Sequence, residues 1–175
     1  MELAIEQQVV PASCDCKKCR SCCTNIPGIP MPEQVVRIAE FLKMPLMQCL
    51  EQYFIVGQRD GVERIGTNED GIAEYDMTEF VYPARVGCAG QRENWQYTCR
   101  RGACSFLTDD EHCMVHEVKP FECKMTFGCR ERLVESPNAK ALLAWRKAWK
   151  DGTVHPFIVD FIKTSPKMRG GYDDE

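Results

Sequence analysis

The chain has 175 residues, of which 44% are hydrophobic and 27% charged, and its formal net charge is −4 at pH 7. A chain of this length can bury a hydrophobic core, so unlike a small zinc finger it does not need metal merely to fold. The negative charge argues against a general nucleic-acid-binding protein, and no apolar run is long enough to cross a bilayer.

The first residues lack the pattern of a secretory signal, because no basic segment is followed by an apolar stretch. We therefore expect a cytoplasmic protein, in which thiols stay reduced. The 12 cysteines would otherwise allow six disulfides, which a reducing compartment disfavours. A redox-active dithiol such as Cys16 and Cys19 would need a strand–helix–strand context that the sequence does not offer. Metal ligation is the remaining hypothesis for the clustered thiols.

Five of the cysteines fall within the ten residues from Cys14 to Cys23. Cys16, Cys19 and Cys22 recur every third residue, so they can hold three corners of an iron–sulfur cubane whose fourth ligand comes from elsewhere. On a helix, Cys23 would share a side with Cys16 and Cys19, whereas in a loop Cys22 would be equally available. The choice between Cys22 and Cys23 stays open. Lysine, arginine and serine between the sulfurs are untypical of zinc turns, which favours a cluster modestly.

Two helices are predicted after this cluster. Residues 26–32 contain three prolines and form a rigid linker. Proline is favoured at the first helical position, so a helix should start near Pro32. The apolar pattern restarts after Pro45, and a two-helix unit fits residues 32–55. Cys49 lies on the apolar stripe of the second helix, where a thiol behaves as a small core residue.

The middle of the chain reads as short β structure. Residues 57–78 are rich in Gly, Asp, Glu and Asn and predict turns or weak hairpin strands. Residues 79–86 resemble an edge strand, and 87–103 a loop that contains Cys88 and Cys99. A short hairpin is then expected over residues 105–116, with Cys104 and Cys113 on its two arms.

A C-terminal helix should run from about Pro137 to Lys150, with Trp145 and Trp149 on its buried face. A short packed segment follows at residues 156–162, and 166–175 form a mobile acidic tail. We therefore predict a single, loop-rich α+β domain over residues 1–165 whose core is organised around a metal site.

Two separated motifs resemble a known family. Residues 16–23 read CKKCRSCC, and residues 102–124 read GACSFLTDDEHCMVHEVKPFECK. The first is similar to the signature of the CxxCxxCC cysteine-cluster family (YkgJ-like proteins), described as zinc- or iron-chelating. The second resembles that family's G-x-C-x-F-L, turn, C-x-I-Y-E-x-R-P-x-x-C-R. His116 stands at the usual tyrosine, which implies a packing role, while Lys119 and Lys124 replace arginines.

The resemblance implies a set of thiol ligands drawn from both motifs: Cys16, Cys19, Cys22, Cys23, Cys104, Cys113 and Cys123, with Cys129 as an eighth. The eight thiols fit one site or two. Cys14, Cys88 and Cys99 are extra to the family pattern. Basic residues flank both motifs, and cations favour the ligating thiolate.

The leading hypothesis is a cytosolic protein that holds an iron–sulfur cluster, or iron, through cysteine thiolates. It would act in electron transfer or metal handling, or as an accessory to a larger enzyme, which implies a protein partner. One alternative is a zinc-stabilised interaction module without chemistry of its own. Another is a cluster-dependent enzyme related to flagellin lysine N-methylases, in which a similar cysteine domain occurs. No phosphate-binding loop or nucleophile elbow supports independent catalysis.

Overall fold

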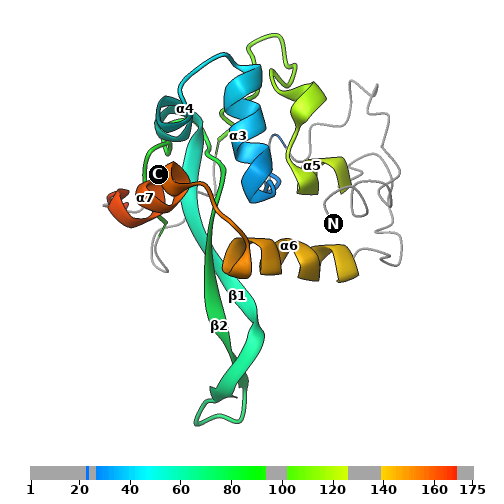
Figure 1. The fold of residues 1–175 in the computed structure, drawn as a ribbon, viewed down its shortest axis with the longest axis vertical. Helices are drawn as coiled ribbons and strands as arrows, with labels where there is room; N and C mark the ends of the chain where they lie inside the picture. Colours follow the sequence, from blue (N-terminus) through cyan, green and yellow to red (C-terminus); the bar gives the residue numbers. More distant parts are fainter. Residues whose placement is uncertain (1–22, 24–26, 94–101, 126–138, 169–175) are drawn as a thin grey trace.

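The computed structural model describes residues 23, 27–93, 102–125 and 139–168. One antiparallel hairpin stands at the centre, and helices pack around its upper part (Figure 1). The elements in chain order are α3 (Pro32–Phe41), α4 (Leu46–Tyr53), β1 (Phe54–Thr67), β2 (Ala73–Pro83), η1 (His116–Val118), α5 (Phe121–Met125), α6 (Ala139–Asp151) and α7 (Pro156–Thr164). The prediction of a small α+β fold is confirmed.

The two-helix unit forms as predicted at its start and differs at its end. α3 begins at Pro32, and the Gln34 side chain accepts a hydrogen bond from the backbone N–H of Met31 at 2.9 Å. α4 follows Pro45 and ends at Tyr53. Phe54, which we expected on the second helix, instead opens β1 and pairs with Pro83 of β2. The β-branched residues after Phe54 favour the extended conformation.

The hairpin is longer than the predicted turns and weak strands, although its register shifts between Asp60 and Gly66. β1 has 14 residues and β2 has 11, and they pair antiparallel from Phe54 to Thr67. The glycines of β1 misled the sequence prediction. A Cβ at Gly57 would lie 2.7 Å from the Tyr82 ring and 3.2 Å from that of Phe80. Glycine is therefore needed here because two cross-strand aromatic rings cover its backbone.

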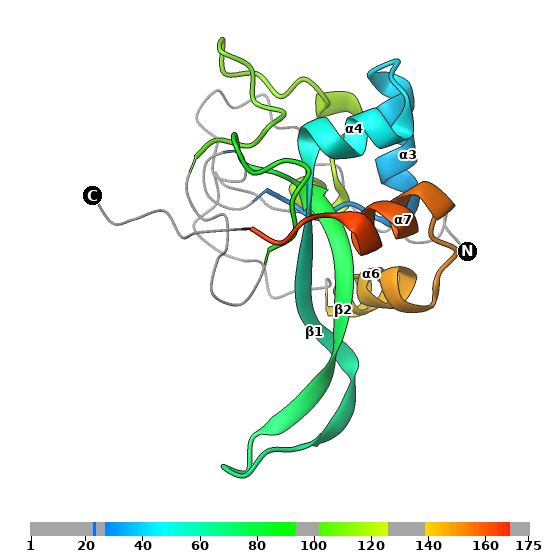
Figure 2. The same cartoon turned by 90° about the vertical axis from the view of Figure 1, so that its left-hand side faces the viewer.

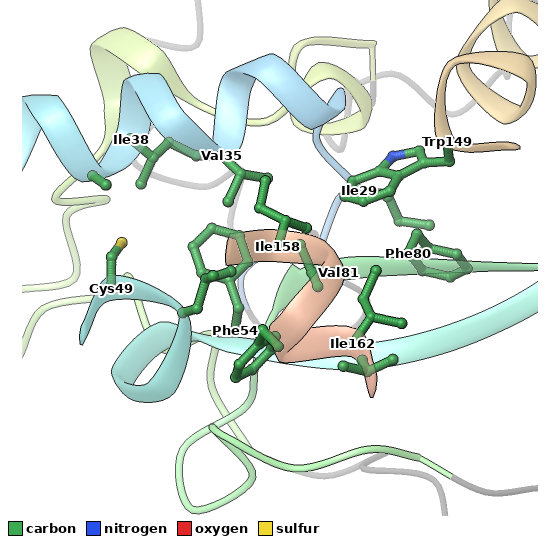
Figure 3. Packing of buried hydrophobic residues seen from close by; sticks show 14 of the residues in the cluster. Ile29, Val35, Ile38, Cys49, Phe54, Phe80, Val81, Trp149, Ile158 and Ile162 are labelled. Atoms are coloured by element: carbon green, nitrogen blue, oxygen red, sulfur yellow. The ribbon is translucent and has the colours of Figure 1, made fainter. Parts of the chain in front are cut away.

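The core lies between the base of the hairpin and the helices. Figure 3 shows side chains from α3, α4, α7 and the strands meeting in one apolar cluster. The Phe80 ring packs edge-on against Trp145 of α6, with ring centroids 5.5 Å apart. Trp145 and Trp149 are both buried, as predicted for the inner face of this helix. Residues 156–162, which we expected to pack as a short terminal segment, form most of α7.

Two short backbone pairings widen the sheet at its base. Arg92 pairs in parallel with Val56 on one side and with Lys167 on the other. Met168 donates its backbone N–H to Arg92 at 2.9 Å and is only 9% exposed. The packed domain therefore extends at least to Met168, beyond the predicted boundary at residue 165, and the rest of the expected tail lies outside the described residues.

Candidate metal centre

Half of the eight predicted ligands lie in the part of the chain that the structure describes. Cys104 is 7% exposed, and the other three thiols are partly buried. None of the four is in a disulfide. The described predicted ligands are Cys23, Cys104, Cys113 and Cys123. The remaining four, Cys16, Cys19, Cys22 and Cys129, lie outside the described residues.

A backbone hydrogen bond joins the two cysteine motifs directly. The N–H of Cys104 donates to the carbonyl of Cys23 at 2.7 Å. Cys104 also forms an antiparallel bridge with Arg85, just after β2. The residue that ends the first motif is therefore held beside the first thiol of the second motif, although they are far apart in the sequence.

Cys113 is tied to Cys104 through Leu107. Leu107 donates its backbone N–H to the Cys104 carbonyl at 2.9 Å and forms an antiparallel bridge with Cys113. The turn between them is closed by Thr108, whose N–H donates to the carbonyl of His112 at 2.9 Å. The predicted short hairpin therefore exists as one bridge and a tight turn. His116 is exposed in η1, so the packing role implied for it is wrong.

Cys123 lies against the backbone that follows the first motif. A Cβ at Gly28 would be 2.5 Å from the Cys123 nitrogen and 2.6 Å from its Sγ. Two hydrogen bonds between Ile29 and Glu122, the residues next to Gly28 and Cys123, hold the two backbones together. Ile29 donates its N–H to the Glu122 carboxylate at 3.0 Å, and Glu122 donates its own N–H to the Ile29 carbonyl at 3.2 Å. The start of α5 is thus clamped to residues 28 and 29.

Buried polar groups stabilise the contact between residues 27–31 and the start of α5. The Gln34 side-chain oxygen accepts from the N–H of Phe121 at 2.9 Å as well as from Met31, and Gln34 is only 4% exposed. The indole N–H groups of Trp145 and Trp149 both donate to the Pro30 carbonyl at 2.9 Å. The proline linker is therefore held by contacts with α3, α5 and α6 together, and these hydrogen bonds satisfy backbone groups of a segment that has no helix or strand.

The described residues do not make a complete metal site. Among residues 23, 27–93, 102–125 and 139–168, no group of three or more His, Cys, Asp or Glu side chains is placed to hold a metal ion. The other four predicted ligands lie outside those ranges. What the described half provides is four thiols on three neighbouring segments, and thiolate sulfur suits zinc, iron and iron–sulfur clusters.

Arg85 is a neighbour of the thiols that the sequence prediction missed. It is 7% exposed, and its guanidinium donates to the Gly102 carbonyl at 3.0 Å. Residues that face each other in an antiparallel bridge have side chains on the same side of the ladder. Arg85 therefore shares a face with Cys104. The residues lie far apart in the sequence, and only the pairing of segments reveals the contact.

The remaining described cysteines have other roles. Cys49 is fully buried in the core, as predicted, and desolvation by burial raises the pKa of its thiol to about 12. Cys88, whose role the sequence left open, is buried and disulfide-bonded, which differs from the expectation that the thiols stay reduced. A framework of six disulfides is excluded in this structure, because five described cysteines form none.

None of the helices within the described ranges has the length and hydrophobicity needed to span a bilayer. No protein-family model, curated protein or solved structure matches this chain.

Proposed function

We propose that this protein binds metal through cysteine thiolates, holding an iron–sulfur cluster or iron for electron transfer, metal handling or the service of a larger enzyme. The proposed ligands come from both motifs: Cys16, Cys19, Cys22, Cys23, Cys104, Cys113, Cys123 and Cys129. The observation that carries the proposal is the meeting of the motifs, through the hydrogen bond from Cys104 to Cys23 and the contact of Cys123 with Gly28.

The local environment supports ligation by these thiols in two ways. Among the described ligands, Cys104 is buried and Cys23, Cys113 and Cys123 are partly buried, which limits the access of water and oxidants to their sulfur atoms. The guanidinium of Arg85, on the same face as Cys104, offsets part of the negative charge that several thiolates bring together. A bound cluster would supply one-electron transfer, and the chain would supply the ligands, the positive charge and the exclusion of water.

The nature of the metal is tested by anaerobic purification, a visible spectrum, and assays of iron, zinc and acid-labile sulfide. A brown protein with iron and sulfide is the expected result. A colourless protein with stoichiometric zinc would instead favour the zinc-stabilised module. A chain that retains neither metal after anaerobic reconstitution would refute the proposal. Far-UV circular dichroism before and after chelation shows whether the fold survives metal removal.

The ligand assignment is tested with serine variants from both motifs. Cys19→Ser and Cys104→Ser should each lower bound metal, because the site draws on both halves of the chain. Cys49→Ala is the matched control, since its thiol lies in the core next to α3 (Figure 3), and it should keep its metal. Equal retention of metal in all three variants would contradict the assignment, as would release of metal by the control.

A further inference from the structure

The outer part of the hairpin extends beyond the body of the protein. In Figures 1 and 2 both strands continue past α6, and no other described element lies beside their far end. An ion pair joins the hairpin to α6, between Lys150 Nζ and an Asp76 carboxylate oxygen 2.6 Å apart. We call residues 60–77 the arm.

The arm combines exposed apolar side chains with strong negative charge. Ile65, Ile72 and Met77 are 66%, 63% and 55% exposed. The arm contains six acidic residues and one basic residue, which gives it a net charge of −5. Because the whole chain carries −4, the residues outside the arm carry a net charge of +1. A two-stranded ribbon alone is marginally stable in water, and its open edges favour pairing with another chain. These properties fit a docking element better than a free loop.

We propose that the arm docks on α6 of a second copy of this chain, so that two copies exchange arms about a twofold axis. α6 is the most cationic of the described helices, with Lys140, Arg146, Lys147 and Lys150 against Asp151, a net charge of +3. Lys147 is exposed and Arg146 is partly exposed, whereas the Lys150 side chain is 28% exposed and paired with Asp76. The ion pair between Lys150 and Asp76 already joins these two elements within one copy.

The paired part of the arm is short enough to lie within the length of α6. Register shifts between Asp60 and Gly66 place this part of β1 opposite only the four residue steps from Met77 to Ala73, which cover about 13 Å at about 3.3 Å per residue. The 13 residues of α6 span about 20 Å at 1.5 Å per residue. An arm laid along a partner's α6 would therefore bring Glu69, Asp70 and Glu74, all exposed, within reach of its cations. An anionic nucleic acid or membrane surface would be repelled by the same charges.

The first test is the mass of the purified, metal-loaded full chain, measured by light scattering and by sedimentation over a range of concentrations. We expect twice the 20.0 kDa of the chain, with a shift toward monomer as salt screens the charges. A monomer at every concentration and at low salt overturns the proposal, and leaves a different basic protein as the candidate partner.

The second test reverses charge on each side of the proposed contact. Glu69→Lys with Asp70→Lys and Glu74→Lys should raise the dimer dissociation constant at least about tenfold, because close charge pairs dominate such contacts. The matched control is the triple Glu40→Lys, Glu51→Lys and Glu117→Lys, which changes the net charge equally at exposed sites outside the arm and should stay dimeric.

The third test restores the contact by a charge swap. The double variant Arg146→Glu with Lys147→Glu, made without other changes, should weaken the dimer. When it is combined with the three lysine substitutions in the arm, the dimer should form again. The proposal is overturned if the arm triple remains dimeric, if the control triple dissociates equally, or if the swap fails to restore the dimer. Circular dichroism must show that each variant is folded.

Discussion

The close approach of Gly28, just after the first cysteine motif, to Cys123 of the second motif can be tested by adding a single methyl group. Gly28→Ala would place a Cβ 2.5 Å from the backbone nitrogen of Cys123 and 3.0 Å from the carbonyl carbon of Glu122. Backbone atoms cannot turn away as a flexible side chain can, so the two segments must separate by close to 1 Å to reach ordinary van der Waals distance. Gly28 is not in the left-handed region, so its requirement is one of space.

The expected loss of stability combines two contributions. Overpacking of a tight contact costs about 1–3 kcal/mol. Separation also weakens the two hydrogen bonds between Ile29 and Glu122, each worth about 1 kcal/mol and more where the carboxylate accepts. A total of about 3 kcal/mol would lower the urea midpoint by about 1.5 M if the slope is about 2 kcal/mol per M.

The assay is urea unfolding followed by tryptophan fluorescence, because Trp145 and Trp149 both donate to Pro30, close to the substituted residue. Gly66→Ala is the matched control. Its Cβ would make an ordinary contact of 3.5 Å with a Glu74 carboxylate oxygen, so its midpoint should change little. A Gly28→Ala protein with the wild-type midpoint, or equal losses in both variants, would refute the close approach. Metal content measured on the same samples should fall for Gly28→Ala alone.

Two further predictions concern buried groups. At pH 8 iodoacetamide should alkylate Cys49 far more slowly than an exposed thiol, because the side chain is fully buried and burial raises its pKa to about 12, which lowers the thiolate fraction. Fast labelling of the folded chain at Cys49 in peptide mass spectrometry would contradict the burial. Gln34→Leu should cost about 2–4 kcal/mol in urea unfolding, because it leaves the N–H groups of Met31 and Phe121 buried without an acceptor. The exposed Gln58→Leu is its control and should be near neutral, whereas equal losses would mean that the Gln34 hydrogen bonds contribute little.

Sequence patterns predicted the helices well where local signals decide the structure. Proline at the first position fixed the start of α3, and the spacing of Trp145 and Trp149 identified the buried face of α6. The hairpin was underestimated, because its glycines and acidic residues are individually poor strand formers. Gly57 belongs in a strand only because Phe80 and Tyr82 cover it from the neighbouring strand, which is information that a local pattern does not hold.

The sequence predicted which thiols belong to the candidate site, but not which segments of the fold surround them. Cysteine spacing identified the two motifs, but nothing in the sequence indicated that Glu122 would clamp Ile29 or that Arg85 would face Cys104. These contacts depend on how distant segments pair, and their residue types are common elsewhere in the chain. The exposed His116 shows the same limit, because the resemblance implied a packing role and the side chain is exposed instead.

The hydrogen bonds of residues 27–31 also bear on what a metal would have to contribute. Bringing Cys23 and Cys104 together closes a loop of about 80 residues, which costs about 4 kcal/mol in chain entropy. Hydrogen bonds of Gln34, Glu122 and the two tryptophans offset part of this cost, because they join the linker to α3, α5 and α6. Affinity for metal at thiols of both motifs would then depend less on the closure of the chain and more on the sulfur ligands and their surroundings. Such a protein could release its metal and remain ready to bind it again, which suits metal handling better than a site whose loss unfolds the domain.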